Sequence, residues 1–203
     1  MLPRLLLALA LCGPILGSAS SLFSEECQAE ALRLQACFDG FAKKNGGFTD
    51  PQIYRNVVHN KTLVLELVAE LNSASACLGP ARCGPAFLVK YFVDAVDFIA
   101  KRTYIDAAEC LADANLEKLA EGCGKLVGIS DMENPFAVLP SSRQLSQCIA
   151  RNLECSTAER HAFVASGYAA ADLFETLLDG QRIIFQGKKV YFDPSKYENL
   201  LEN

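Results

Sequence analysis

Hydrophobic positions along most of this chain recur every three or four residues, which is the period of an amphipathic α-helix. The first stripe steps through Cys27, Ala31, Leu34, Phe38 and Phe41 and ends near residues 45–47. Five further segments follow the same period: residues 51–78, 85–99, 110–126, 145–149 and 157–179. The pattern therefore predicts a mainly α fold, a bundle of about six helices.

Polar and proline positions predict where these helices begin and end. Asp50 followed by Pro51 resembles an N-cap with proline at the first helical position. Ser156 and Glu159 form a capping box that opens the helix over 157–179. Asp113 is a candidate break within residues 110–126, and residues 128–142, which contain Pro135 and Pro140, predict a loop.

The period changes near the C-terminus. Residues 182–185 and 188–192 are short runs rich in β-branched and aromatic side chains, and they flank Gln186-Gly187. This arrangement predicts a β-hairpin. An isolated hairpin is marginally stable in water, so we expect it to pack on the helices or to remain a flexible tail. Residues 193–203 follow as a polar tail or a short final helix, and 181–203 form a separate C-terminal segment.

Residues 1–20 have the order of a secretory signal peptide. Arg4 is their only charge, an apolar run extends from Leu5 to Leu16, and small residues fill positions 17–20. We expect cleavage after Ala19 or Ser20, with an uncut anchor as the alternative. A membrane span needs about 20 apolar residues, and charges interrupt every later apolar run. The sequence therefore predicts export and no membrane span.

The cysteine count supports the same compartment. One of the nine cysteines, Cys12, leaves with the signal, and eight remain: Cys27, Cys37, Cys77, Cys83, Cys110, Cys123, Cys148 and Cys155. An even number in a secreted chain predicts disulfides. A zinc site would require closer cysteine pairs or more histidines than His59 and His161. Eight cysteines allow 105 connectivities, so the sequence leaves the pairing open.

One sequon for N-glycosylation occurs. Asn60-Lys61-Thr62 is the only Asn-x-Ser/Thr triplet without an intervening proline. In an exported chain Asn60 is therefore a candidate glycan site, with an unused surface asparagine as the alternative.

Residues 21–180 contain the helices and could hold an internal duplication. The segment that begins at Cys27 resembles the one that begins at Cys110, and each half has a wide cysteine pair followed by a close pair. In both halves an Ala-Phe pair follows and opens a helix. The two similar units would be residues 21–103 and 104–180. Chance recurrence of Ala, Phe and Cys is the alternative.

Composition excludes several classes of protein. Hydrophobic residues make up 51% of the chain and charged residues 21%, which is not the composition of a disordered protein. The net charge is -5 and no basic run occurs, so we expect no nucleic-acid partner.

No catalytic constellation is evident. His59 and His161 lack a nucleophile motif beside them and are expected to be surface residues. Asp94 and Asp97 lie three apart on one predicted helix and could serve a hydrolase, although a solvated face explains them as well. No phosphate-binding glycine loop occurs, and we expect no cofactor and no metal.

Three pairs of basic residues are potential processing sites in an exported chain: Lys43-Lys44, Lys101-Arg102 and Lys188-Lys189. Proteolysis prefers exposed, mobile backbone. Lys101-Arg102 lies between the two four-cysteine halves but directly follows a strongly periodic helix, so we do not expect cleavage there.

These features favour a secreted, non-enzymatic binding or interaction protein whose partner is an extracellular protein. The alternative is an extracellular carrier of a small apolar ligand or lipid, because disulfide-pinned helices can hold a cavity open. A hydrolase that uses scattered carboxylates is the third hypothesis.

Overall fold

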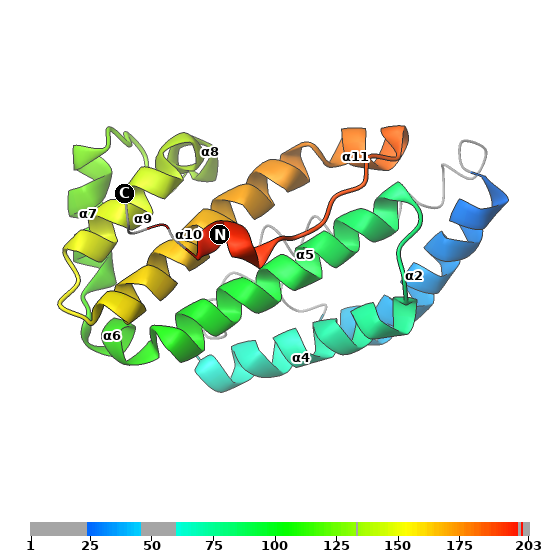
Figure 1. The fold of residues 1–203 in the computed structure, drawn as a ribbon, viewed down its shortest axis with the longest axis horizontal. Coiled ribbons are helices and arrows are strands. Elements are labelled where there is room, and N and C mark those ends of the chain that lie inside the picture. Colours follow the sequence, from blue (N-terminus) through cyan, green and yellow to red (C-terminus); the bar gives the residue numbers. More distant parts are fainter. Residues whose placement is uncertain (1–23, 46–59, 133, 199, 201–203) are drawn as a thin grey trace. The chain divides into compact units, whose positions relative to one another are not determined.

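A computed structural model describes residues 24–45, 60–132, 134–198 and 200. Within them all regular structure is helical and no strand occurs (Figure 1). The α-helices are α2 (Glu25–Asn45), α4 (Lys61–Leu78), α5 (Gly84–Lys101), α6 (Ala108–Asp113), α7 (Leu116–Leu126), α8 (Pro135–Val138), α9 (Ser142–Arg151), α10 (Thr157–Leu178) and α11 (Gly180–Gln186). A π-helical turn, η2 (Arg102–Asp106), and two 3₁₀ turns, η3 (Leu139–Ser141) and η4 (Pro194–Tyr197), complete them. The mainly α prediction is confirmed, with more helices than the six expected.

The chain forms two compact units, each made of two stretches of sequence. The first comprises residues 1–94 and 176–192, and the second comprises residues 95–175 and 193–203. The expected signal segment, residues 1–20, lies outside the described residues. None of the helices in the described part of the chain combines the length and the hydropathy of a membrane span.

In the first unit α2 and α4 lie side by side and antiparallel (Figure 1). A disulfide joins Cys37 of α2 to Cys77 of α4. Lys44, seven residues after Cys37, forms an ion pair with Glu70, seven residues before Cys77, as expected for antiparallel helices. The helix start expected at Asp50 and Pro51 lies outside the described residues, and α4 begins only after Asn60, which is extended and forms its N-cap. Its side-chain oxygen accepts a hydrogen bond from the Leu63 N–H at 3.2 Å.

The core of the first unit centres on the first half of α5. Leu88 and Phe92, both expected on the buried face, are 7% and 1% exposed. Leu71 and Leu78 of α4 are buried as well. The predicted stripe of α5 is therefore confirmed at these positions.

A buried carboxylate fixes the start of α5. Glu30 of α2 is 1% exposed and accepts hydrogen bonds from the backbone N–H groups of Arg82 at 2.9 Å and Cys83 at 2.8 Å. The disulfide between Cys27 and Cys83 lies one turn away along α2. A negative charge at a helix N-terminus is favourable because the free N–H groups carry partial positive charge. Glu30 therefore joins α2 to the beginning of α5 from within the protein interior.

In the second unit the predicted break at Asp113 is confirmed. α6 ends there, Ala114 is extended, and Asn115 caps α7 by accepting a hydrogen bond from the Lys118 N–H at 3.0 Å. The disulfide Cys123–Cys148 joins α7 to α9, and Cys110–Cys155 joins α6 to the connection between α9 and α10. Buried Ile149 and Leu153 pack against these cysteines.

The loop expected over residues 128–142 contains more helix than the sequence suggested. α8 and the 3₁₀ turn η3 occupy residues 135–141. The Asn134 side chain accepts a hydrogen bond from the Phe136 N–H at 3.0 Å, and Pro135 takes the first helical position, where it needs no hydrogen-bond donor. The prolines therefore start short helices here instead of preventing them.

The predicted capping box is present at the start of α10. The Glu159 carboxylate accepts hydrogen bonds from the Ser156 hydroxyl at 2.6 Å and the Ser156 N–H at 3.0 Å, and the Glu159 N–H donates to the Ser156 hydroxyl at 3.2 Å. The carboxylate also accepts from the Cys110 N–H at 3.2 Å. These hydrogen bonds lower the pKa of Glu159 from its ordinary value of 4.5. The bond from the Ser156 hydroxyl has the largest effect, and the bonds from the backbone N–H groups of Ser156 and Cys110 add to it.

This lowered pKa predicts an acid-sensitive contribution to stability. The folded protein holds Glu159 ionised more strongly than the unfolded chain does, so the stabilisation is present above about pH 4.5 and is lost as pH falls through the folded-state pKa. We expect Glu159→Gln to lower the melting temperature at pH 7 and to have a smaller effect at pH 3. Thermal unfolding followed by circular dichroism at both pH values measures this difference. An equal loss at both pH values would contradict it.

The predicted C-terminal β-hairpin is wrong. Residues 180–186 form α11, and Gly187 ends this helix in a left-handed conformation with φ 64°. Ile183 is 1% exposed, and the backbone of Ile183 and Ile184 approaches Gly84 so closely that a side-chain Cβ there would overlap it. Tertiary contact with the start of α5 therefore overrides the local β propensity of the Ile-Ile-Phe run.

Residues 188–193 follow α11 without regular structure, and their aromatic side chains lie on α5. Tyr191 packs edge-on against Phe87, with ring centroids 5.6 Å apart, and Phe192 packs against Tyr91 at 5.9 Å. These contacts belong to the first unit. They replace the strand pairing that the sequence suggested.

In the second unit the turn η4 is anchored by Tyr197. This side chain is 4% exposed, its ring lies 5.4 Å from that of Phe98, and its hydroxyl donates to Asp172 at 2.8 Å. Arg143 of α9 donates to the same Asp172 and to Glu175, both on α10. The expected polar tail therefore includes a fixed turn.

Candidate binding site

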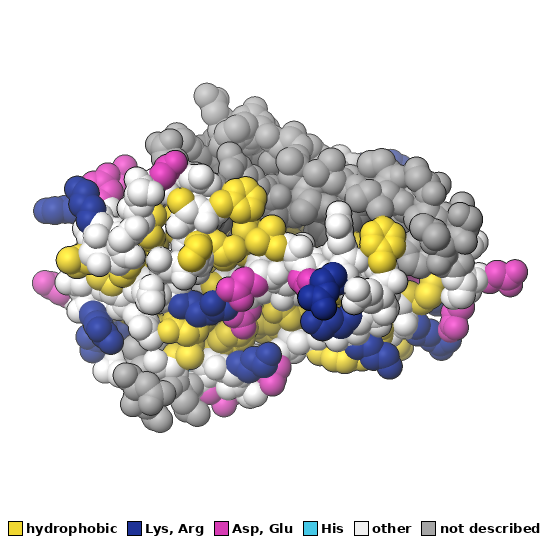
Figure 2. Space-filling view, turned by 90° about the horizontal axis from the view of Figure 1, so that it is seen from above, with side chains coloured by type: hydrophobic (Ala, Val, Ile, Leu, Met, Phe, Trp, Pro, Cys, Tyr) yellow, Lys and Arg dark blue, Asp and Glu magenta, His cyan; other side chains and the backbone are white. Residues whose placement is uncertain are grey.

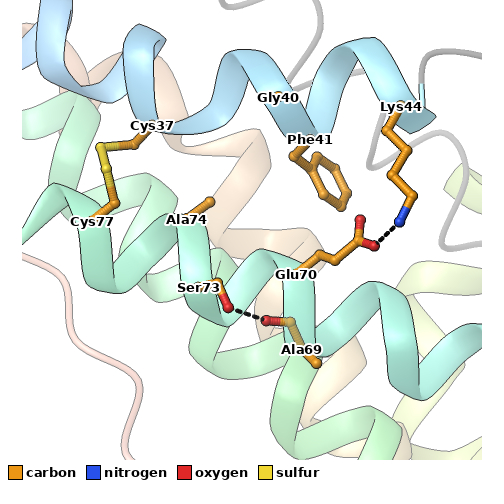
Figure 3. A pocket seen from close by; sticks show the side chains of 9 residues that line it. All are labelled: Cys37, Gly40, Phe41, Lys44, Ala69, Glu70, Ser73, Ala74 and Cys77. Carbon is orange, nitrogen blue, oxygen red and sulfur yellow. Dashed lines mark hydrogen bonds and ion pairs between the residues drawn. A yellow bond between two sulfur atoms is a disulfide. The ribbon is translucent and has the colours of Figure 1, made fainter.

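A groove runs between α2 and α4 in the first unit (Figure 3). Its volume is about 490 Å³, which is within the range of ligand and side-chain binding sites. Nine residues line it: Cys37, Gly40, Phe41, Lys44, Ala69, Glu70, Ser73, Ala74 and Cys77. Every one of these residues belongs to α2 or α4, so two helices alone form the walls.

Helical spacing brings these residues onto facing sides. The α2 positions follow one another at intervals of three, one and three residues, and the α4 positions at one, three, one and three, so each set forms a single stripe. The disulfide Cys37–Cys77, with Cα atoms 5.8 Å apart, joins the stripes at one end of the groove (Figure 3). Because the bridge is covalent, the helices cannot separate there.

Small side chains keep the groove open. Ala69, Ser73 and Ala74 of α4 stand opposite Gly40 of α2, and a Cβ added to Gly40 would meet no atom within 4 Å. The Ser73 hydroxyl donates to the Ala69 carbonyl at 2.9 Å, a bond within its own helix. The wall therefore presents mostly methyl and methylene surface, with the Phe41 ring as its one aromatic side chain.

Charge is concentrated at the end of the groove away from the disulfide. The Lys44 ammonium forms an ion pair with the Glu70 carboxylate (Figure 3). This pair raises the pKa of Lys44, mainly through the hydrogen bond to Glu70 and also through the negative charge of Glu70. Both residues belong to the lining. The groove thus combines an apolar stretch with a positive and a negative group at one end.

Basic and acidic side chains elsewhere on the surface also alternate. Figure 2 shows Lys and Arg side chains beside Asp and Glu side chains on the face that it draws, without a broad area of one sign. Among the described residues, whichever face they lie on, Arg143 pairs with Asp172 and Glu175, and Lys188 pairs with Asp179. This face does not present the basic surface that a phosphate backbone attracts.

The eight cysteines form four disulfides: Cys27–Cys83, Cys37–Cys77, Cys110–Cys155 and Cys123–Cys148. The expected disulfide framework is confirmed, and the structure supplies the pairing that the sequence left open. In each set of four the first cysteine pairs with the fourth and the second with the third. This shared nested order is what a duplication of residues 21–103 and 104–180 would produce.

The other predicted residues do not converge on one site. Asn60 is exposed at the start of α4, and Asp97 of α5 pairs with Lys101 at 2.7 Å. His59 lies outside the described residues. His161 is half-buried, not the surface residue expected, and its Nε2 is buried without a hydrogen-bond partner among the described residues.

The groove itself was missed by sequence reasoning, which singled out Cys37 and Cys77 only for their sulfur. The available signal was a run of small residues, Ala69, Ser73 and Ala74, on the stripe of α4 that faces α2. In the described part of the chain no three His, Cys, Asp or Glu residues cluster as metal ligands would. The arrangement is suited to non-covalent contact with an apolar group.

No protein-family model, curated protein or solved structure matches this chain.

Proposed function

We propose that this chain is a secreted, non-enzymatic interaction protein whose contact site is the groove between α2 and α4. The observation that carries the proposal is an apolar groove between two helices that a disulfide clamps together. Disulfides form and persist in oxidising compartments, and the disulfide-rich helical structure fits an extracellular protein. A groove held open before binding loses little conformational entropy when it is filled.

The occupant that fits this groove is an apolar segment of a protein partner. Ala69 and Ser73 are exposed, so the groove is open to solvent along α4. A small ligand usually has most of its surface buried, whereas a helix or loop of a partner can lie in a groove between two helices. Lys44 and Glu70 at its end offer both signs of charge to polar groups that flank such a segment.

Filling the groove tests this proposal. We expect Ala69→Trp to weaken capture of the extracellular partner by about tenfold or more, because an indole ring would occupy space that the partner needs. The matched control is Ala76→Trp, which is also exposed on the same helix but does not line the groove. Affinity purification from extracellular fluid with quantitative mass spectrometry compares the two variants with the native chain.

The control separates a local effect from a general one. Retention of the same partner by Ala76→Trp and its loss by Ala69→Trp would support the groove as the contact site. Equal capture by both variants would contradict it. Circular dichroism and free-thiol titration of both variants establish that the fold and the four disulfides are unchanged.

The carrier of a small apolar ligand is the second candidate function, and the same groove is its site. Phe41 and the alanines would contact the ligand, and Lys44 would pair with an acidic head group. Native mass spectrometry of secreted material distinguishes the two functions. A co-purifying lipid that Ala69→Trp displaces favours the carrier, and an unliganded mass favours the protein partner.

Export and glycosylation belong to the same proposal. The three residues of the sequon, Asn60, Lys61 and Thr62, are exposed. The helix cap uses the Asn60 Oδ1, whereas a glycan is attached through Nδ2, so one side chain can serve both roles. We propose that Asn60 carries an N-glycan and that residues 1–20 are removed during export.

A further inference from the structure

The three pairs of basic residues lie in different backbone structures. Lys43-Lys44 occupies the last turn of α2. Lys101-Arg102 spans the junction between α5 and the π-helical turn η2, so its backbone is helical on both sides. Only Lys188-Lys189 lies in non-helical backbone, in the stretch 188–193 that follows α11, and both lysines are exposed.

Backbone structure decides which pair a protease can use. Endoproteases bind their substrates as extended segments that pair with a strand of the enzyme, so a helix must first unwind. Gly187 has already turned the chain out of α11 with φ 64°, and residues 188–193 continue without helical hydrogen bonding. On the other side only the end of α11, a helix of seven residues, would have to open.

The side chains of the pair are accessible as well. The Lys188 ammonium lies 3.6 Å from the Asp179 carboxylate, and the two side chains are 56% and 33% exposed. An ion pair at this separation and exposure is weak and exchanges readily with a carboxylate of another protein. Tyr191, two residues beyond the pair, is 66% exposed.

We propose that Lys188-Lys189 is a maturation site for a serine endoprotease that selects paired basic residues in the secretory pathway. The enzyme hydrolyses the peptide bond between Lys189 and Val190. Water supplies the hydroxyl that completes the carboxyl group of Lys189 and the proton that completes the new amine of Val190. This inference rests on the proposed export of the chain, because such proteases act in that compartment.

Cleavage would leave the terminal segment attached by non-covalent contacts alone. Residues 190–203 contain no cysteine, so no disulfide retains them. In the first unit Tyr191 and Phe192 contact Phe87 and Tyr91. In the second unit the hydroxyl of the buried Tyr197 donates a hydrogen bond to Asp172. The cut therefore converts contacts within one chain into contacts between two chains, one of which can dissociate.

Limited proteolysis of the full, disulfide-intact chain tests the site. With a paired-basic-selective subtilisin-like protease and intact-mass spectrometry, we expect the first product to lack residues 190–203. It should appear about tenfold faster than any product cut at the other two pairs, since their helices must open first. Lys189→Gln should abolish this cut, and the control Lys43→Gln, which removes another basic pair outside the groove lining, should leave its rate unchanged. A chain that stays intact, or is cut first at another pair, would overturn the proposal.

Expression in secreting cells gives the second arm. Exported protein that ends at Lys189, or at a residue before it after trimming, supports the site, and exported protein with an intact C-terminus overturns it. Retention of the chain inside the cell would refute the proposed function instead. The proteolysis of purified protein tests the site whether or not the chain is exported.

Discussion

Replacing Glu30 with alanine is expected to lower the free energy of unfolding by roughly 3 kcal/mol. The carboxylate is 1% exposed and is the acceptor for two backbone N–H groups, those of Arg82 and Cys83, at the start of α5. Alanine leaves both donors without this partner, and each hydrogen bond to a charged acceptor contributes about 1.5–3 kcal/mol. Equilibrium unfolding in urea with the disulfides intact measures the loss.

Two variants make this result specific. Glu30→Gln keeps one acceptor oxygen but no charge, so we expect about half of the loss. Glu26→Ala is the surface control, because Glu26 pairs with the Arg82 guanidinium while 62% exposed. We expect the Glu26→Ala protein to lose less than about 1 kcal/mol of unfolding free energy. Equal stability of the Glu30→Ala and Glu26→Ala proteins would show that the buried carboxylate does not hold α5.

Removing the disulfides of the first unit is expected to have the other large effect, and in a non-additive way. Cys27–Cys83 encloses Cys37–Cys77, and their sequence separations are 56 and 40 residues. While the inner bridge is intact, the loop that the outer bridge closes has only about 16 residues, ten from Cys27 to Cys37 and six from Cys77 to Cys83. Loss of chain entropy in a loop of that size contributes about 3 kcal/mol.

Removal of the second disulfide should therefore lower the free energy of unfolding by more than removal of the first. Cys27→Ala/Cys83→Ala should lose about 3 kcal/mol, and further replacement of Cys37 and Cys77 should lose about 4 kcal/mol more, since the remaining loop of 40 residues is then released. Urea unfolding of the two variants measures both steps. Equal losses, or a smaller second loss, would show that strain or residual structure in the unfolded chain outweighs loop entropy.

These two expectations bear on the proposed contact site. Cys37–Cys77 lies in the groove, whereas Glu30 and Cys27–Cys83 hold α2 to the start of α5. A variant without Cys37–Cys77 would keep α2 attached at its other end but let the groove widen. Partner binding should then weaken even where the helices remain folded, because the groove would no longer be fixed before binding.

Much of the architecture could be predicted from local sequence. The stripe of α5 and the Ser156–Glu159 capping box depend on spacing within one helix, so periodicity and hydrogen-bonding chemistry were sufficient. The break at Asp113 likewise depends on residues next to it, with Asn115 as the cap. The presence of disulfides required only the even count of cysteines in a chain with an expected signal peptide.

The C-terminal segment shows where local reasoning fails. Residues 182–185 favour a strand by composition, but Ile183 and Ile184 approach Gly84, about 100 positions earlier in the chain, and are helical. The buried contact that stabilises the helix involves a residue outside any local window, so β propensity could not reveal it. The aromatic contacts of Tyr191 and Tyr197 with α5 are of the same kind.

The sequence by itself determined the helical class, the presence of disulfides and several helix ends, because each follows from neighbouring residues or from composition. Only the tertiary structure decided which cysteines pair, where the buried Glu30 finds its donors, and that small residues of α2 and α4 face each other across a groove. Those features join residues that are 25 or more positions apart. Side-chain packing brings such residues together, and no local pattern specifies which helices will meet.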